Sequence, residues 1–314
     1  MAVPRDEWLT LMDREYLRDF VRGGGGAVRV AVAEAALLPG IRQYLEQRAT
    51  AAGFDVLAID AADTKIHQFH LVFFAIARSI DWAALTQARL EALVAEAGYT
   101  WPLPGQRMSV AALAEANGVA APLLHRALMR DMTSRVWRDS RLAQDFRRAM
   151  VALLDSRLSD DKDGLRDGVI DWLHGDLRTL RPVKEAQIGA RITLQSARAM
   201  LISLCHWLHA CRRPGLVVVL DISRLLRDRR EVSDGVTYTP AAVMAAYEVI
   251  RQVIDDAEHY PGLFLVVLAD PRLTDDSVPR RGLGAYDALR LRLSNDVRPQ
   301  ARDNPLAPLV VLAA

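Results

Sequence analysis

The chain has 314 residues, a formal net charge of +1, 51% hydrophobic residues and two cysteines. A charge near zero argues against a protein that binds polyanions over its whole surface, and two cysteines exclude a disulfide framework. The lysines are Lys65, Lys162 and Lys184, and none of them follows a glycine, so the standard Walker A loop G-x-x-x-x-G-K-[ST] is excluded.

The sequence carries no evident targeting or membrane signal. Its N-terminus, MAVPRDEW, lacks the charged and then apolar pattern of a signal peptide. The longest apolar run, around Leu216–Leu220, has the length of a strand and not of a membrane span. We therefore expect a cytoplasmic protein without a membrane partner.

The first predicted element is an amphipathic helix over Asp6–Val21, which ends at the four glycines Gly23–Gly26. Glycine permits backbone conformations that are closed to other residues. The run is interpreted either as a helix stop and flexible joint, or as a segment whose backbone closely approaches a ligand. The sequence leaves both interpretations open.

Short apolar runs along the chain predict buried strands. They cover Ala27–Ala33, Phe54–Asp60, Leu216–Asp221, Leu263–Ala269 and Leu309–Leu312. Helical patterns lie between them, over Ile41–Ala52, Ala190–Ala210, Pro240–Glu258 and Tyr286–Leu293. Because strands that alternate with helices form parallel sheets with right-handed crossovers, we expect an α/β fold.

The long segment between the second and third strands predicts a helical insertion. Its helices are expected over Asp81–Ala97, Val110–Asn117, Pro122–Arg138 and Leu142–Leu158, with a break at Trp101–Gly105 and a loop at Ser159–Gly164. The expected organisation is an N-terminal helix and Gly-rich joint (1–26), the first part of the α/β core (27–80), the insertion (81–185) and the remainder of the core (186–314).

The turn after the first predicted strand occupies the place of a phosphate-binding loop. A phosphate cradle needs glycines, whose backbone N–H groups converge on the anion, and a lysine that offsets its charge. Here Glu34 would repel a phosphate, Leu38 has no charge, and Pro39 has no N–H; Gly40 is the glycine that remains. The pattern predicts a degenerate nucleotide loop with a structural role.

Acids end the third and fourth strands. Asp221 closes an apolar run in the manner of a Walker B motif, whose carboxylate orients hydrated Mg²⁺, but Ile222 follows where an ATPase usually carries a second acid. Asp270 takes the place of a residue that senses the γ-phosphate. In the next loop, Arg280 and Arg281 are candidate arginine fingers for a neighbouring subunit, or solvated loop residues.

Two other clusters were considered as sites. Arginines gather in the predicted insertion, where Arg126, Arg130, Arg138 and Arg141 are candidate nucleic-acid contacts, although interleaved acids favour a solvated, internally paired helix face. Cys205 and His209 lie one helical turn apart, but no second ligand pair is near them, so no metal site is predicted.

The ordered segments resemble the ATP-binding P-loop proteins of bacterial BREX-type phage-defence islands, in particular the smaller member encoded beside a large helicase. The resemblance runs from about Glu15 to Leu312. It is carried by EYLRDFVRGGGGAVRVAV, GFDVLAIDAADTKIH, WLHGDLRTL, ARITLQSARAMLISLCHWL, GLVVVLDISRLL, YTPAAVMAAYEVIRQVID, RRGLGAYDALRLRL and NPLAPLVVL.

This resemblance implies an AAA+-like fold of the ASCE division with strand order 5-1-4-3-2, ATP and Mg²⁺ as ligands, and a helicase or sister ATPase as partner. The Walker A lysine and Ser/Thr of the family align with Leu38 and Pro39, and its Walker B pair with Asp221 and Ile222. The resulting hypothesis is a non-hydrolysing scaffold or regulatory subunit, in a homo- or hetero-oligomer. The alternatives are an ATPase with a non-standard loop and a DNA-binding accessory or helicase loader.

Overall fold

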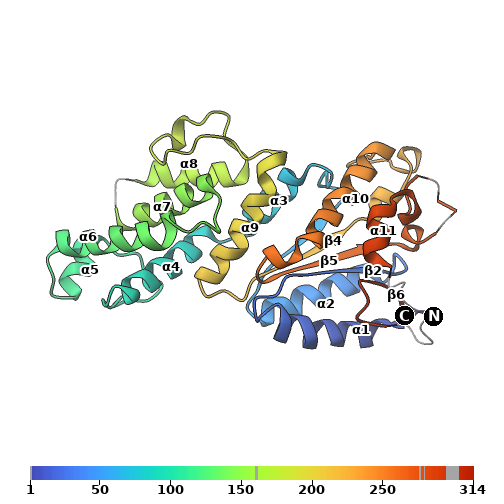
Figure 1. Cartoon of the computed structure of the whole chain (residues 1–314), viewed down its shortest axis with the longest axis horizontal. Helices are drawn as coiled ribbons and strands as arrows, with labels where there is room; N and C mark the ends of the chain where they lie inside the picture. Colours follow the sequence, from blue (N-terminus) through green and yellow to red (C-terminus); the bar gives the residue numbers. More distant parts are fainter. Residues whose placement is uncertain (1, 160–161, 276, 279, 295–303) are drawn as a thin grey trace. The chain divides into compact units, whose positions relative to one another are not determined.

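The computed structural model describes residues 2–159, 162–275, 277–278, 280–294 and 304–314. The chain divides into two compact units. Unit 1 contains the residues up to Ala75 together with Arg213–Ala314, and unit 2 contains Ile76–Arg212. Figure 1 shows the sheet of unit 1 and the helices of unit 2.

Unit 1 is built on a parallel six-stranded sheet, which confirms the predicted α/β class. The strands are β1 Val3–Pro4, β2 Ala27–Val32, β3 Asp55–Asp60, β4 Leu216–Asp221, β5 Leu263–Ala269 and β6 Leu309–Ala313. Every residue of β5 is buried, as expected for a central strand covered on both faces. The apolar runs therefore gave reliable strand predictions.

The strand order is β1-β6-β2-β5-β4-β3 and differs from the predicted order 5-1-4-3-2. The difference is strand β1, which adds to the edge beside β6, with Val3 opposite Leu312. The five predicted strands keep their relative order within this larger sheet. A two-residue strand has no alternating pattern that a sequence could reveal, and Pro4 is tolerated there because an edge strand need not donate every N–H.

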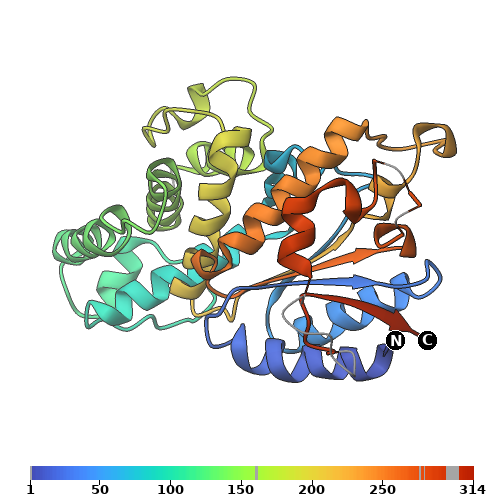
Figure 2. The same ribbon diagram turned by 45° about the vertical axis from the view of Figure 1, so that its right-hand side comes forward.

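Helices cover both faces of this sheet (Figures 1 and 2). One face carries α1 Arg5–Leu11, the π-helical segment η1 Met12–Phe20 and α2 Leu38–Ala51; the other carries α10 Pro240–Asp255 and α11 Asp287–Leu293. Trp8, Leu17 and Leu45 pack with Phe264 in the core of the first face. Burial of these apolar side chains holds α1, η1 and α2 on the sheet.

The glycine run ends in a close approach of the backbone to another part of unit 1. A Cβ on Gly26 would lie 2.0 Å from the carbonyl oxygen of Ala257, in the short helix Ala257–His259. Gly24 has a φ of +96°, a value that favours glycine. The close approach is thus made to the protein's own backbone.

Unit 2 is helical over its described residues. It contains α4 Trp82–Glu96, α5 Val110–Ala116, α6 Ala121–Met132, the π-helical segment η2 Thr133–Trp137, α7 Gln144–Leu158, α8 Asp163–His174 and α9 Leu194–Ala210. Trp82 and Phe146 meet edge to face in its core, and Trp172 and Trp207 are fully buried. These four aromatic side chains are part of the core of unit 2.

Two helices differ from the sequence-based expectation. Helix α3, Phe69–Ser79, follows β3 in a stretch for which no helix was predicted. Helix α8 begins at Asp163, inside the predicted loop Ser159–Gly164, of which residues 160 and 161 lie outside the described residues. Gly168 explains why α8 was not predicted, because glycine disfavours a helix. In the structure this glycine allows close packing, since a Cβ at this position would lie 2.8 Å from the Pro182 side chain.

Candidate functional site

The carboxyl ends of β2, β3, β4 and β5 meet at one edge of the sheet in unit 1. In parallel α/β sheets this edge is where ligands bind. Asp60 and Asp221 are register partners at the ends of β3 and β4. Asp270 follows β5, and Glu34 follows β2 by one residue. Acidic residues thus follow four neighbouring strands at the expected position of a nucleotide.

The loop between β2 and α2 is a tight turn. The N–H of Leu37 donates to the carbonyl of Glu34 at 2.8 Å, and the N–H of Ile41 then donates to the carbonyl of Leu37 at 3.1 Å, which starts the helix. Glu34 itself is exposed. Its carboxylate therefore adds an exposed negative charge to this turn.

Leu38, Pro39 and Gly40 form the first turn of α2. Leu38 is only 5% exposed and belongs to the core between α2 and the sheet. Pro39 has no N–H to offer an anion. A Cβ on Gly40 would meet nothing within 4 Å, so no close approach requires this glycine. The first residue of α2 thus carries an apolar side chain packed in the core.

Two acids at the ends of β3 and β4 bind the turns that follow them. Asp221 Oδ1 accepts from the Ser223 N–H at 2.9 Å, and Asp60 Oδ1 accepts from the Ala62 N–H at 2.7 Å. Burial raises the pKa of Asp60 above its ordinary value, and the charges of Asp221 and Asp63 act in the same direction. The pair is therefore electrostatically unfavourable for a further anion.

Asp60 was not among the sequence-predicted site residues. The signal was present, because its apolar run ends in Asp as that of Asp221 does. The residue after Asp221, Ile222, is 1% exposed, and its N–H donates to the Leu268 carbonyl at 2.8 Å. A hydrocarbon side chain packed in the core cannot polarise a water molecule.

Asp270 is buried and is used within its own loop. Its Oδ1 accepts from the Arg272 N–H at 2.9 Å, and its own N–H donates to Ser223 Oγ at 3.2 Å. Its second carboxylate oxygen lies 4.0 Å from Arg227. These contacts connect the end of β5 to the turn after β4, which is a structural role for the residue predicted as a sensor.

A cavity of about 530 Å³ opens beside these residues. The described residues that line it are Glu34, Ala35, Asp270, Pro271, Arg272, Thr274 and Asp275. They bring three carboxylates and one guanidinium, and the guanidinium of Arg272 is paired with Glu231 at 2.6 Å. An acidic lining of this kind does not fit the polyphosphate of ATP, so no step is assigned to a nucleotide here.

The two candidate arginine fingers lie in different surroundings. Arg281 is buried, and its guanidinium donates to the carbonyls of Leu225 at 3.1 Å and Tyr238 at 3.0 Å. Arg280 is exposed and has a φ of +63°. The side chain of Arg281 thus holds segments of its own unit together, and the finger role stays a prediction that concerns Arg280 more than Arg281.

Tyr238 fixes the loop after β3. Its hydroxyl accepts from the Ile66 N–H at 3.1 Å and lies within donating distance of the Ala61 and Thr64 carbonyls, at 2.9 and 2.7 Å. Burial raises the pKa of Tyr238 to about 12, so the hydroxyl keeps its proton near neutral pH. The loop is therefore held in place on one side of Asp60.

The arginines predicted to contact nucleic acid lie in unit 2 and are exposed. Arg126 Nε donates to the Pro122 carbonyl at 3.3 Å, and Arg130 lies 3.7 Å from Asp131. Arg141 donates to both carboxylate oxygens of Asp139, at 2.9 and 2.8 Å. Arg138 follows η2 directly. The structure brings Arg138 and Arg141 into one loop and leaves Arg126 and Arg130 on α6.

Among the described residues, no group of three or more His, Cys, Asp or Glu is arranged to hold a metal ion. Cys205 is buried, and burial raises the pKa of its thiol to about 12. Within the same described ranges, no single helix has the length and apolar content needed to cross a membrane.

Comparison with known families places the chain beside an ATP-binding family of phage defence. The model of the family described as BREX system ATP-binding protein BrxC/D matches residues 41–314. This confirms the predicted resemblance to BREX-type ATP-binding proteins. Searches of curated proteins and of solved structures gave no match.

Proposed function

This chain belongs to the BREX system ATP-binding protein BrxC/D family, and we propose that it serves a phage-defence system as an AAA+-like subunit that does not hydrolyse ATP. The observation that carries the proposal is the burial of Leu38 and Ile222. The resemblance described above aligns Leu38 with the phosphate-binding lysine and Ile222 with the second Walker B acid, and the burial of both apolar side chains supports the loss of these two functions.

Both losses affect the transfer of a phosphoryl group. The lysine and Mg²⁺ together offset the charge that develops on the β- and γ-phosphates, and positioning with electrostatic stabilisation supplies almost all of the catalysis. Here Glu34 and the Asp60–Asp221 pair add negative charge at the same edge of the sheet. A chain with these residues is better suited to assembly than to hydrolysis.

The remaining fold supports a scaffold role. The order of β6, β2, β5, β4 and β3 fits a P-loop fold of the ASCE division, and the acids at the strand ends are bound into their own turns. We infer that the chain has kept the architecture with which such proteins assemble. The expected partners are a sister P-loop ATPase or a helicase of the same defence system.

The nucleotide question is tested by the melting temperature with and without Mg-ATP. A ligand that binds the native state at a hundred times its Kd adds about 2.7 kcal/mol to the free energy of unfolding. We expect no such shift. A clear shift that disappears in Asp221→Asn would show that the chain binds Mg-ATP at the end of β4 and would contradict the expected loss of nucleotide binding.

The hydrolysis test needs a control for contaminating ATPases. Phosphate release by the purified chain is compared with that of Asp221→Asn and of Arg42→Ala, because Arg42 is the alternative cation near the loop and lies 3.9 Å from Glu46. Equal background release in all three samples is expected. Activity that either substitution removes would identify a genuine active site.

Assembly is tested by co-expression with the P-loop ATPase and the helicase of the same defence system, followed by size-exclusion chromatography. We expect a stable complex whose formation is unchanged by Asp221→Asn. A chain that elutes as a monomer at micromolar concentration, with each partner eluting separately, would contradict the scaffold role.

A further inference from the structure

Trp137 is an exposed tryptophan in unit 2. It ends η2 and remains 41% exposed, whereas Trp82, Trp172 and Trp207 in the same unit are buried. A large aromatic ring gains free energy when it leaves water, so an exposed one beside a hollow indicates a contact surface.

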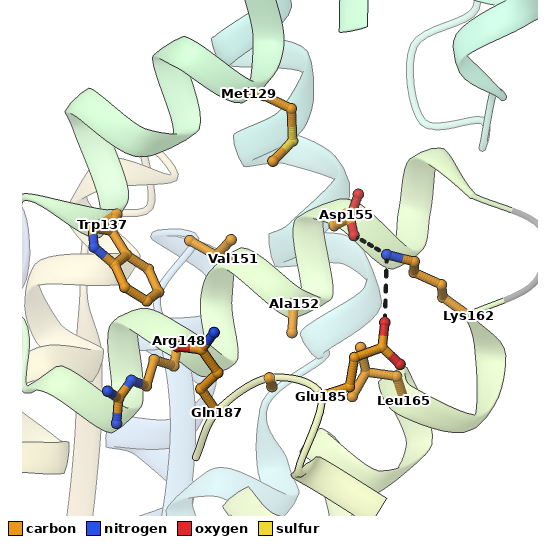
Figure 3. Close-up of a pocket in the computed structure, with 11 residues that line it drawn as sticks. Met129, Trp137, Arg148, Val151, Ala152, Asp155, Lys162, Leu165, Glu185 and Gln187 are labelled. Atoms are coloured by element: carbon orange, nitrogen blue, oxygen red, sulfur yellow. Dashed lines mark hydrogen bonds and ion pairs between the residues drawn. The ribbon is translucent and has the colours of Figure 1, made fainter. Parts of the chain in front are cut away.

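Two hollows adjoin at this side chain, because Trp137 and Arg148 line both. The larger cavity is about 170 Å³. Besides Trp137, its apolar lining consists of Met129, Val151, Ala152, Leu165 and Ala186. Figure 3 shows Trp137 and Arg148 on one side of it and Asp155, Lys162 and Glu185, joined by ion pairs, on the other.

The smaller hollow is basic. Its lining residues are Trp137, Gln144, Arg147 and Arg148. Arg147 donates to the carbonyl of Trp137 at 3.0 Å, which uses one of the five N–H donors of a guanidinium. Arg148 is paired with Asp145 at 2.9 Å. Cationic donors therefore lie directly beside the exposed indole.

The charge around this site favours an anionic ligand. Arg138 and Arg141 follow Trp137 in the exposed loop. Between residues 126 and 157 the sequence has eight arginines and four aspartates. Four of these arginines are ion-paired: Arg130 with Asp131, Arg135 with Glu96, Arg141 with Asp139 and Arg148 with Asp145. The other four are Arg126, Arg138, Arg147 and Arg157. A local excess of arginine suits a phosphate backbone even though the whole chain is nearly neutral.

The volume of the larger cavity limits the size of the group that it can bind. Pockets for complete drug-sized ligands have about 300–1,000 Å³, and 170 Å³ is smaller. A single flat ring on Trp137, with its chain passing Arg147 and Arg148, matches the apolar lining and the neighbouring charges. A base within a duplex is stacked on its neighbours and cannot enter such a hollow, whereas an unstacked base of a single strand can.

We propose that Trp137, Arg147 and Arg148 form a binding site for single-stranded nucleic acid. One base stacks on the Trp137 indole over the apolar lining, and the adjacent phosphate lies against the two arginines. The site is in unit 2, and it requires neither a nucleotide nor any residue at the sheet edge of unit 1. The proposed site thus adds single-stranded nucleic acid to the expected ligands of the scaffold. This proposal can be wrong while the scaffold role is right.

The test is fluorescence anisotropy with a labelled oligothymidine of about 16 nucleotides, a length that covers typical single-strand sites. We expect Trp137→Ala to weaken binding about tenfold, because stacking on an aromatic ring is lost, and Trp137→Phe to retain most of it. Leu123→Ala is the matched control, because Leu123 is 56% exposed on α6 and does not line either hollow.

Arg147→Gln tests the phosphate contact separately. Each neutralised phosphate of a single strand contributes about −0.7 to the slope of log K against log salt. The slope should therefore become shallower in this variant, while its melting temperature stays that of the parent.

Three results would overturn the proposal. They are no binding of the oligonucleotide at low salt, equal affinities of Trp137→Ala and Leu123→Ala, or tighter binding of a duplex than of the single strand. If Trp137→Ala instead loses a protein of the defence complex while oligonucleotide binding is unchanged, the hollow is a protein-docking surface and the proposal is wrong.

Discussion

Asp60 and Asp221 are register partners at the carboxyl ends of β3 and β4, so two carboxylates lie side by side where a nucleotide would need cations. Each accepts a backbone N–H from the turn that follows its strand. The two acids thus shape the turns at this edge, and they do so at an electrostatic cost to each other.

This cost predicts that Asp60→Asn stabilises the protein at neutral pH. Because the pKa of Asp60 is raised in the folded state, chiefly by burial, the folded protein takes up this proton more readily than the unfolded chain. Ionised Asp60 therefore opposes folding above its folded pKa. Asparagine keeps Oδ1 as the acceptor for the Ala62 N–H. The gain should be below about 1 kcal/mol, since Asp60 is partly exposed.

The pH dependence provides the check. Urea unfolding of parent and Asp60→Asn should differ most near pH 7, and the difference should shrink as the pH falls toward about 4. An Asp60→Asn variant that is less stable than the parent at pH 7, with a deficit that shrinks on acidification, would mean that the Asp60 carboxylate stabilises the fold.

Replacing Leu38, at the start of α2, is expected to destabilise the protein. Leu38→Ala should lower the free energy of unfolding by about 2–4 kcal/mol, because it removes a buried side chain from the core under α2. Gly40→Ala is the control in the same helical turn: its Cβ meets open space, and a gain of about 0.5–1 kcal/mol is expected. Equal effects in urea unfolding would show that Leu38 does not pack in the core.

The sequence predicted the central strands of the sheet well, but it did not predict the edge strand β1, helix α8 or the burial of Leu38. Apolar runs such as Leu263–Ala269 are buried on both faces, and their composition records that environment directly. Strand β1 was missed because two residues carry no periodicity, and α8 because Asp163 and Gly168 are typical of loops. Leu38 is buried in the core because α2 begins at this residue. The sequence could not predict this, because a residue pattern does not define the first residue of a helix.

The exposure of Trp137, in the proposed nucleic-acid site of unit 2, could not be predicted from the sequence either. A tryptophan in an apolar helical pattern is ordinarily a core residue, and its exposure arises because η2 ends at that residue. Asp60, in contrast, was available to the sequence argument, since Asp221 ends its strand in the same pattern. Paired strand ends become visible only once the register of β3 and β4 is known.

Gly26 is predicted to be irreplaceable at its position. A Cβ there would lie 2.0 Å from the Ala257 carbonyl oxygen, so Gly26→Ala must displace backbone and should cost about 2–4 kcal/mol. Gly25→Ala is the matched control, because its Cβ would meet the ring of Phe20, which is 52% exposed and free to turn away. The melting temperatures of both variants provide the test. A Gly25→Ala variant as unstable as Gly26→Ala would show that the requirement for glycine is not specific to Gly26.

We expect Arg281 to be needed for the stability of the fold and Arg280 to be dispensable for it. Arg281→Ala removes two hydrogen bonds to the buried carbonyls of Leu225 and Tyr238 and should cost about 2–3 kcal/mol. Arg280→Ala should change stability by less than about 0.5 kcal/mol, because the residue is exposed. Denaturant unfolding of the free chain and assembly with the sister ATPase are measured on both variants. If Arg281→Ala leaves the free chain fully stable and impairs the complex alone, Arg281 acts on a neighbouring subunit, as an arginine finger would, and its bonds within unit 1 are dispensable.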